Sequence, residues 1–501
     1  MDQASEARPP AENLPRRVKA VFGFGSMAFG IQLQFGGLLL LFYNQVIGLP
    51  AAAVSWALGI ALLFDAFWDP MIGQVSDRLR TRWGRRHPIM YFSALPLAAG
   101  FLALWNPPSG WPVASLLTYL LVAIIAARLT ASFYEVPSVA LLPELAPNYH
   151  DRTVLLSYRW MFGTLGAAIT AVLSFGWFLR STPEFPTGQL NRAGYEPLSW
   201  ALAALIVISI LVSAAGTHHR IPQLYKPTGR DAGLVETMRY MVATLRNRNF
   251  GVAVVAGMLG GLGTGLTGGL SIYFSTFFWE LPARNILILI LSGLAATPVA
   301  AALAPVVSRR WGKRNCCMTL FFASVVTAAG PFVLALAGAF PPSGSATLVV
   351  LLTVFAFFTG VFGTSGYILV TSMLADIVEE TQLKTGRRSE GLLLSADSLI
   401  AKVVTAFGTI LPGLLLGFVG FPEKAQPGQV PTATLENLVI GYVVLTVVLN
   451  TLSIWVWKFY RIDQAAHERN LTKIAEAQAL AASALTSEGA PSPLIAPAPP
   501  A

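Results

Sequence analysis

Two aspartates in an apolar setting are the first candidates for chemistry. Asp65 and Asp69 follow the run "VSWALGIALLF", and their spacing of four residues places both on one helix face, a turn apart. A carboxylate in hydrocarbon costs at least ~2.5 kcal/mol, and two close carboxylates repel each other unless one is protonated or a cation lies between them. The pair therefore predicts a cation-binding site that faces a cavity. The alternative is that both acids are structural partners of arginines.

A second polar stripe carries the complementary charge. In "IIAARLTASFYEVP", Arg128, Ser132 and Glu135 are spaced i, i+4 and i+7, so they share a helix face. Arg128 can neutralise Glu135 along its own helix or reach an aspartate of the first stripe. We expect this stripe to line the same cavity, the alternative being a purely structural pair of Arg128 and Glu135.

Two further bases lie in apolar stretches. Lys402, in "DSLIAKVVTAFG", lies deep in its stretch, and an ammonium at that depth needs a carboxylate partner. We therefore expect Lys402 to face the cavity and to pair with an acid of the two stripes. Arg159, in "LLSYRWMF", lies nearer the start of its stretch, where it can either face the cavity or snorkel to the interface.

The elements that position these residues are long and apolar. Of the 501 residues, 54 % are hydrophobic and only 12 % are charged, whereas about a quarter of a soluble protein is charged. A helix of about 20 apolar residues crosses ~30 Å of hydrocarbon. The sequence predicts an all-α membrane protein with twelve transmembrane helices, at 20–47, 51–76, 88–106, 112–141, 157–180, 198–216, 250–279, 285–307, 315–340, 346–375, 391–420 and 436–460.

The basic residues predict the orientation of these helices. With a cytosolic leader at 1–19, the loops of the opposite side contain only Arg180, Arg192, Arg284 and Lys424 among the 34 lysines and arginines. This bias is typical of a positive-inside topology. It predicts a multi-pass plasma (inner) membrane protein with both termini cytoplasmic. The net charge of +9 is explained by this bias, and no nucleic-acid partner is expected.

The chain also repeats itself. "RTRWGRRHP" after the second stretch recurs as "SRRWGKRN" after the eighth. This predicts two six-helix halves, 20–216 and 250–460, joined by a cytoplasmic linker at 217–249 and followed by a largely disordered tail at 461–501. Such a parallel repeat resembles the major facilitator superfamily.

In that fold the basic turns are cytoplasmic, and their side chains bond carboxylates and helix ends in one access state only. The resemblance thus implies a gate. Its predicted members are Asp77, Arg78, Arg82, Arg85, Arg86, Arg310, Lys313 and Arg314. The alternative is that these residues are topology signals only.

Within that superfamily, the chain resembles the glycoside–pentoside–hexuronide:cation symporter family. The resemblance lies in Lys402 and in the motifs "DAFWDP", "WGRRHP" and "YEVPSVALLPELAPNYHDRTVLLSYR". The resemblance covers nearly all of the membrane domain. It implies that Asp65 and Asp69 bind the cation with help from Ser132, and that Lys402 couples cation to substrate. Predicted substrate contacts are Glu135, Arg159, Arg128 and Gln34.

Two departures from the family pattern bear on specificity. Gly30 stands where sugar-specific members have an aspartate, which puts sugar recognition in doubt, although Gln32 and Gln34 follow. Trp68 replaces an asparagine beside the second aspartate. Losing a carbonyl oxygen removes a ligand for a hard cation, which favours a proton over sodium as the coupling ion.

The sequence therefore predicts a cation-coupled secondary active symporter, not an enzyme, that carries a small sugar- or glycoside-like solute by alternating access. H⁺ or Na⁺ is the coupling ion, and no other metal and no cofactor is expected. The expected partners are the solute, the cation and the lipid bilayer, with the protein a monomer. The alternatives are a symporter of lysolipid or another amphiphile and, outside this class, a non-transporting membrane receptor.

Overall fold

The computed structural model describes residues 14–146, 149–224, 247–385 and 390–462, together with the single positions 469, 472 and 476. Most of the predicted linker and tail and the first part of the predicted leader lie outside these residues. Within them, twelve helical segments are long and apolar enough to cross a membrane, as predicted. Eleven of these segments coincide largely with the helices α4 (Ala51–Arg78), α5 (His87–Trp105), α6 (Val113–Leu145), α7 (Tyr149–Ala171), α8 (Tyr195–His218), α10 (Arg248–Tyr273), α11 (Ala283–Trp311), α12 (Lys313–Leu336), α13 (Ala346–Thr385), α14 (Glu390–Phe418) and α15 (Thr432–Trp457).

The first span is broken into α1 (Arg16–Phe24), α2 (Met27–Leu33), α3 (Gly36–Leu41) and the π-helix η1 (Phe42–Ile47). Gly30 explains one close contact of this span. A Cβ atom at Gly30 would lie 1.9 Å from the carbonyl oxygen of Gly163 in α7. An aspartate at this position would therefore clash with α7, which explains why the acceptor of sugar-specific members is absent here.

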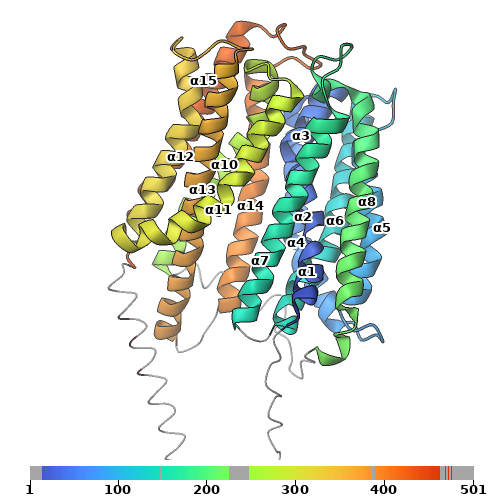
Figure 1. Ribbon diagram of the computed structural model, residues 1–501, viewed down its shortest axis with the longest axis vertical. Helices are drawn as coiled ribbons and strands as arrows, with labels where there is room; N and C mark the ends of the chain where they lie inside the picture. Colours follow the sequence, from blue (N-terminus) through green and yellow to red (C-terminus); the bar gives the residue numbers. More distant parts are fainter. Residues whose placement is uncertain are drawn as a thin grey trace, which may run out of the picture.

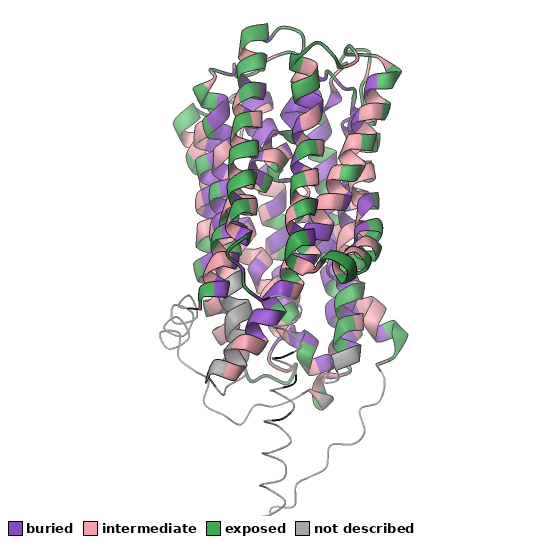
Figure 2. Ribbon diagram, turned by 90° about the vertical axis from the view of Figure 1, so that its left-hand side faces the viewer, coloured by how far each residue is buried: buried purple, intermediate pink, exposed green. Residues whose placement is uncertain are grey.

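The helices form two groups (Figure 1). The spans up to α8 lie on one side and α10 to α15 on the other, with α7, α11 and α14 near the boundary. Each group contains six spans, so the predicted fold of two six-helix halves is confirmed. Exposed residues follow the outward faces of the helices (Figure 2), and large apolar side chains such as Phe92, Phe322 and Phe418 are among the exposed ones. Such an apolar belt suits contact with lipid.

One end of the bundle holds the halves together. We call it the outer end, because the basic turns lie at the opposite, inner end, drawn downward in Figure 1. Tyr273 of α10 donates a hydrogen bond to Asn44 of η1 at 2.8 Å, and Gln189 donates to Thr276 at 3.0 Å. Gln45 donates to the carbonyl of Pro422 at 3.0 Å. These buried side chains join the halves at the outer end.

Backbones of the two halves also approach closely between α3 and α10. A Cβ atom at Gly37 would lie 2.7 Å from the carbonyl oxygen of Gly268, whereas one at Gly36 would meet nothing within 4 Å. Only glycine at position 37 permits this crossing, because any side chain would force the two backbones apart. Beside this crossing, α4 and α10 both pack against α14, and α7 packs against α11 as a further contact between the halves.

Candidate functional site

A cavity of about 1760 Å³ lies between the two halves. It is lined by residues of α2, α3, α4, α6 and α14, and by others from α10 to α13 and α15. At the inner end its lining reaches Asp77 and Arg78, the last residues of α4. Since the outer end is crossed by the hydrogen bonds described above, the cavity faces the side of the basic turns.

Both aspartates of α4 line this cavity, as expected from their spacing. The Lys402 ammonium of α14 donates a hydrogen bond to Asp69 Oδ2 and lies 3.5 Å from Asp65 Oδ2. A base from one half thus lies between two acids of the other. Asp69 Oδ1 is buried, with no hydrogen-bond partner among the described residues, so this oxygen is free to accept a proton or to ligate a cation.

Asp65 has two more partners, both from α6. Ser132 donates its hydroxyl to Asp65 Oδ1 at 2.9 Å, and Arg128 Nη1 lies 3.7 Å from Asp65 Oδ2. Arg128 was predicted to pair either with Glu135 on its own helix or with an aspartate of α4, and in the structure it lies near the aspartate. The oxygens of Asp65, Asp69 and Ser132 therefore form one group that can hold a small cation.

Glu135 pairs with a different base. Arg159 of α7 donates to Glu135 Oε1 at 2.7 Å and to Ser138 Oγ at 2.6 Å, and its guanidinium lies 5.5 Å from the ring of Phe22. Arg159 is 9 % exposed, so it points into the bundle and does not snorkel. Glu135 lines the cavity, while Arg159 lies behind it. This geometry makes Arg159 a support for Glu135.

We call Asp65, Asp69, Arg128, Glu135, Arg159 and Lys402 the charged cluster. Its three acids and three bases balance, and each acid lies within 4 Å of a base. Charges at membrane depth are stable when paired in this way. The cluster draws on four helices, so it exists only in the folded bundle.

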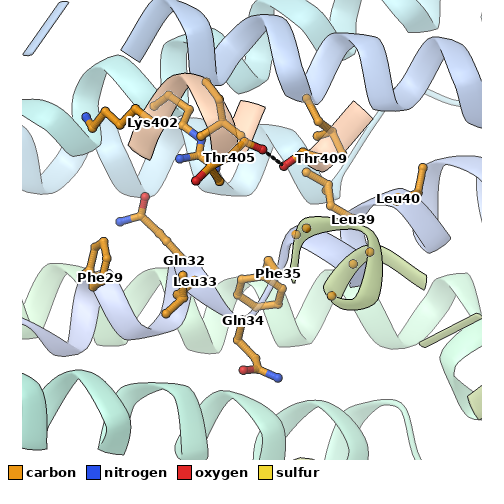
Figure 3. Close-up of a pocket in the computed structure, with 18 of the residues that line it drawn as sticks. Phe29, Gln32, Leu33, Gln34, Phe35, Leu39, Leu40, Lys402, Thr405 and Thr409 are labelled. Carbon is orange, nitrogen blue, oxygen red and sulfur yellow. Dashed lines mark hydrogen bonds between the residues drawn. The ribbon is translucent and has the colours of Figure 1, made fainter. Parts of the chain in front are cut away.

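Several polar residues of the cavity lining were not predicted as site residues. Gln32, Thr405 and Thr409 line the cavity, and Figure 3 shows Gln32 pointing toward the side that carries Lys402 and Thr405, while Gln34 points the opposite way. The signal for the threonines was present, because they follow Lys402 at i+3 and i+7 and so share its face. Gln34, which was predicted, also lines the cavity.

The predicted gate residues form ion pairs at the inner end of the first half. Arg85 Nη2 lies 3.0 Å from Glu144 Oε1, and Arg86 Nη2 lies 2.7 Å from the same oxygen and 3.0 Å from Asp77 Oδ1. Arg82 lies 6.0 Å from the ring centre of Trp83. Glu144, which closes these pairs from the end of α6, was not predicted.

The second half repeats this arrangement. Lys313 Nζ lies 2.7 Å from Asp376 Oδ1 of α13, and Arg314 donates to the carbonyl of Tyr460 at 3.2 Å. Arg310 lies exposed at the end of α11. Each of these contacts joins elements of one half. The basic turns therefore tie helix ends together within each half in this access state.

No group of three or more metal-ligating side chains (His, Cys, Asp or Glu) gathers within the described part of the chain.

Comparisons with known proteins agree with the geometry. A family model described as MFS/sugar transport protein matches residues 21–464. The isoprimeverose transporter of Lactiplantibacillus pentosus is 25 % identical, covering 92 % of this chain and 93 % of its own. The putative glycoside/cation symporter YagG of Escherichia coli (strain K12) is 24 % identical, covering 93 % and 96 %.

Among solved structures, the nucleoside transporter NupG (D323A mutant) superposes with a TM-score of 0.61 at 17 % identity, covering 89 % of this chain and all of its own. That likeness supports the fold alone. The family match spans nearly the whole membrane domain. The chain therefore belongs to the MFS/sugar transport protein family, and its predicted place among the glycoside–pentoside–hexuronide:cation symporters is confirmed.

Proposed function

We propose that this protein is a cation-coupled symporter that carries a sugar- or glycoside-like solute by alternating access of its two halves. The family and the named relatives support secondary transport of a small solute. The observation that carries the coupling is the position of Lys402. Its ammonium lies against both Asp65 and Asp69, where a coupling cation would otherwise lie.

In this mechanism Lys402 is an internal substitute for the cation. When a proton or a sodium ion binds at Asp65 and Asp69, it weakens the hold of these acids on the ammonium. Lys402, which comes from the other half, is then released from α4. Cation binding thereby changes a contact between the halves, which is what coupling requires.

We infer that the ion is a proton. Sodium prefers several oxygen ligands, as other hard cations do, whereas this group offers two carboxylates that already contact Lys402, together with the Ser132 hydroxyl. One proton on Asp69 removes the negative charge that attracts Lys402 to it. Trp68, the departure from the family pattern, does not supply an oxygen ligand either.

For the remaining cavity residues we propose solute contact by Glu135, Arg128, Gln32 and Gln34, with Arg159 holding Glu135 in place. The gate residues of the basic turns are proposed to stabilise the access state seen here. The protein is proposed to be a monomer of the plasma (inner) membrane with both termini cytoplasmic, as the distribution of basic residues favours.

The test is transport by purified protein in liposomes. Glycosides that stabilise the protein against heat are offered as labelled solutes under an imposed proton or sodium gradient. We expect accumulation by the unchanged protein and its loss in Asp69→Asn, with downhill exchange retained. Glu196→Gln, an exposed acid in the first turn of α8, is the matched control. Full accumulation by Asp69→Asn would contradict the assignment of Asp69.

A further inference from the structure

The second half contributes a wall of a different chemistry to the cavity. Beyond the charged cluster, the cavity extends among α10, η6 (Phe274–Phe278), α11, α12, α13 and α15. We call this part the apolar chamber, after its lining residues Phe274, Trp279, Ile290, Phe332, Phe355 and Tyr442. Among the described lining residues that these elements contribute, none is charged. The two sides of one cavity thus differ in polarity.

The wall of the chamber is a packed aromatic surface. The ring of Phe332 lies 4.6 Å from that of Phe274, 5.4 Å from that of Trp279 and 5.1 Å from that of Tyr442, as distances between ring centres. These contacts hold the rings in place from three different elements. Such a rigid aromatic wall favours a flat or flexible apolar group over a water-filled space.

The few hydroxyls in the chamber already have partners. Thr359 donates to Thr327 Oγ1 at 2.9 Å, and Thr327 bonds the carbonyl of Ala323 at 2.9 Å. The Tyr442 hydroxyl lies 3.3 Å from that of Thr267. These hydroxyls could still accept from a sugar ring placed here but could not donate to it without breaking their own bonds, so sugar oxygens would lack donors, at a cost of ~1–3 kcal/mol for each unsatisfied group.

The charged cluster, in contrast to the apolar chamber, is rich in groups that can bind a sugar. It offers carboxylates, guanidinium groups and the amides of Gln32 and Gln34 on the side formed by the first half and α14. Because both surfaces line the same cavity, a solute held by its polar end at the cluster can reach the chamber with the rest of its structure. The cavity is also larger than the ~300–1,000 Å³ of a usual small-ligand pocket.

We infer that the solute is amphiphilic, with a polar sugar-like head bound at the charged cluster and an aryl or short alkyl group bound in the apolar chamber. This inference rests on the proposed function and adds the class of solute: a glycoside with an apolar aglycone. The chamber residues, above all Phe332, select for that aglycone.

The experiment compares matched pairs of ligands on the purified full-length protein. Methyl and phenyl β-glycosides of xylose, glucose, galactose and glucuronic acid are titrated, and binding is read from the shift in melting temperature. For the sugar that binds, we expect the phenyl glycoside to bind at least about tenfold more tightly than the methyl glycoside, because its ring is removed from water.

Two variants then locate the preference. Phe332→Ala removes part of the chamber wall, and Ala356→Phe fills the chamber without removing a ring, which covers the case that the first variant folds poorly. Both are expected to bring the ratio of phenyl to methyl affinity close to one while affinity for the methyl glycoside is kept. Phe322→Ala, on the same helix but 61 % exposed on the outside of the bundle, should leave the ratio unchanged.

The outcomes separate this inference from the proposed function. Equal binding of methyl and phenyl glycosides, or a phenyl preference that survives Phe332→Ala and Ala356→Phe, overturns the inference and leaves sugar transport intact. If no glycoside of either series binds, both the head group and the chamber assignment are wrong. For any glycoside that does bind, loss of gradient-driven accumulation in Asp69→Asn is judged separately from the comparison of methyl and phenyl glycosides.

Discussion

At the scale of single residues, the position of Lys402 between two acids of the other half has the sharpest consequences. Its side chain is 28 % exposed and that of Asp69 25 %, so the pair is only partly open to the cavity. Removing one partner of a buried pair leaves an uncompensated charge, with a penalty of up to ~3–5 kcal/mol, reduced where water reaches the site.

Lys402→Met is therefore expected to lower the thermal stability of the protein and to abolish coupled transport. Adding Asp69→Asn should restore much of the stability, because the unpaired charge is then gone. Adding Glu135→Gln should restore none of it, since Glu135 is paired with Arg159. Melting temperatures of the single and double variants measure this, with a double-mutant cycle giving the coupling. Equal recovery by both second substitutions would contradict the observed pairing.

The residues of the site were largely predictable, but their pairing was not. The four-residue spacing in an apolar run was enough to identify Asp65 and Asp69, and the depth of Lys402 implied an acid as its partner. Which base meets which acid depends on helix rotation and on contacts between spans far apart in the sequence. For this reason the choice of Arg159 as the partner of Glu135, and the role of Glu144 at the inner end, required the structure.

At the scale of elements, the crossing of α3 and α10 is the feature most open to test. It depends on the absence of a side chain at Gly37, where a Cβ would lie 2.7 Å from a backbone carbonyl, and a backbone atom cannot move aside as a flexible side chain can. Gly36, its neighbour, has open space at the same position.

We expect Gly37→Leu to hold the outer end open. A single reporter cysteine at Thr405, which is exposed to the cavity, should then react with a membrane-impermeant maleimide added from outside, several-fold faster than in the parent. The native cysteines, Cys316 and Cys317, are buried. Gly36→Leu is the matched control and should react as the parent does. If both variants behave alike, the crossing does not close the outer end.

The ion pairs of the first basic turn give a second prediction at this scale. Arg86 joins Glu144 and Asp77 in the structure whose cavity faces the inner end. Because these pairs are formed in this access state, Arg86→Gln should reduce its population. Labelling of the Thr405 cysteine from the inner side should fall, with topology unchanged. Arg310→Gln, at an exposed position of the second turn, serves as control. Unchanged labelling in Arg86→Gln would mean that the turn sets topology only.

Prediction of the elements succeeded where apolar length alone decides the outcome. All twelve spans lie close to their predicted positions, because crossing hydrocarbon requires a run of fixed minimum length. The breaks in the first span were not predicted. At the first break, a Cβ atom at Gly25 would lie 1.7 Å from the hydroxyl of Tyr134, and a hydropathy profile contains no information on such contacts.

At the scale of the whole molecule, coupling predicts which ion the protein takes up with its solute. If the ion is a proton, adding a glycoside that binds the protein to liposomes containing the protein should cause protons to enter the liposomes. A pH-sensitive dye measures this uptake. Asp69→Asn should abolish this signal. Replacing choline by sodium should leave the melting temperature unchanged. A rise with sodium that is lost in Asp69→Asn would instead identify sodium as the coupling ion.

The balance of charge in the cluster also decides how the membrane potential acts on the transport cycle. The charges of three acids and three bases cancel. When the halves of the empty carrier rock, the cluster therefore moves no net charge through the membrane potential. With one cation and a neutral glycoside bound, the same motion carries one positive charge, which is worth about 2.3 kcal/mol per 100 mV. A negative interior therefore pulls the loaded carrier inward and leaves the empty carrier free to return, so that voltage as well as concentration drives accumulation.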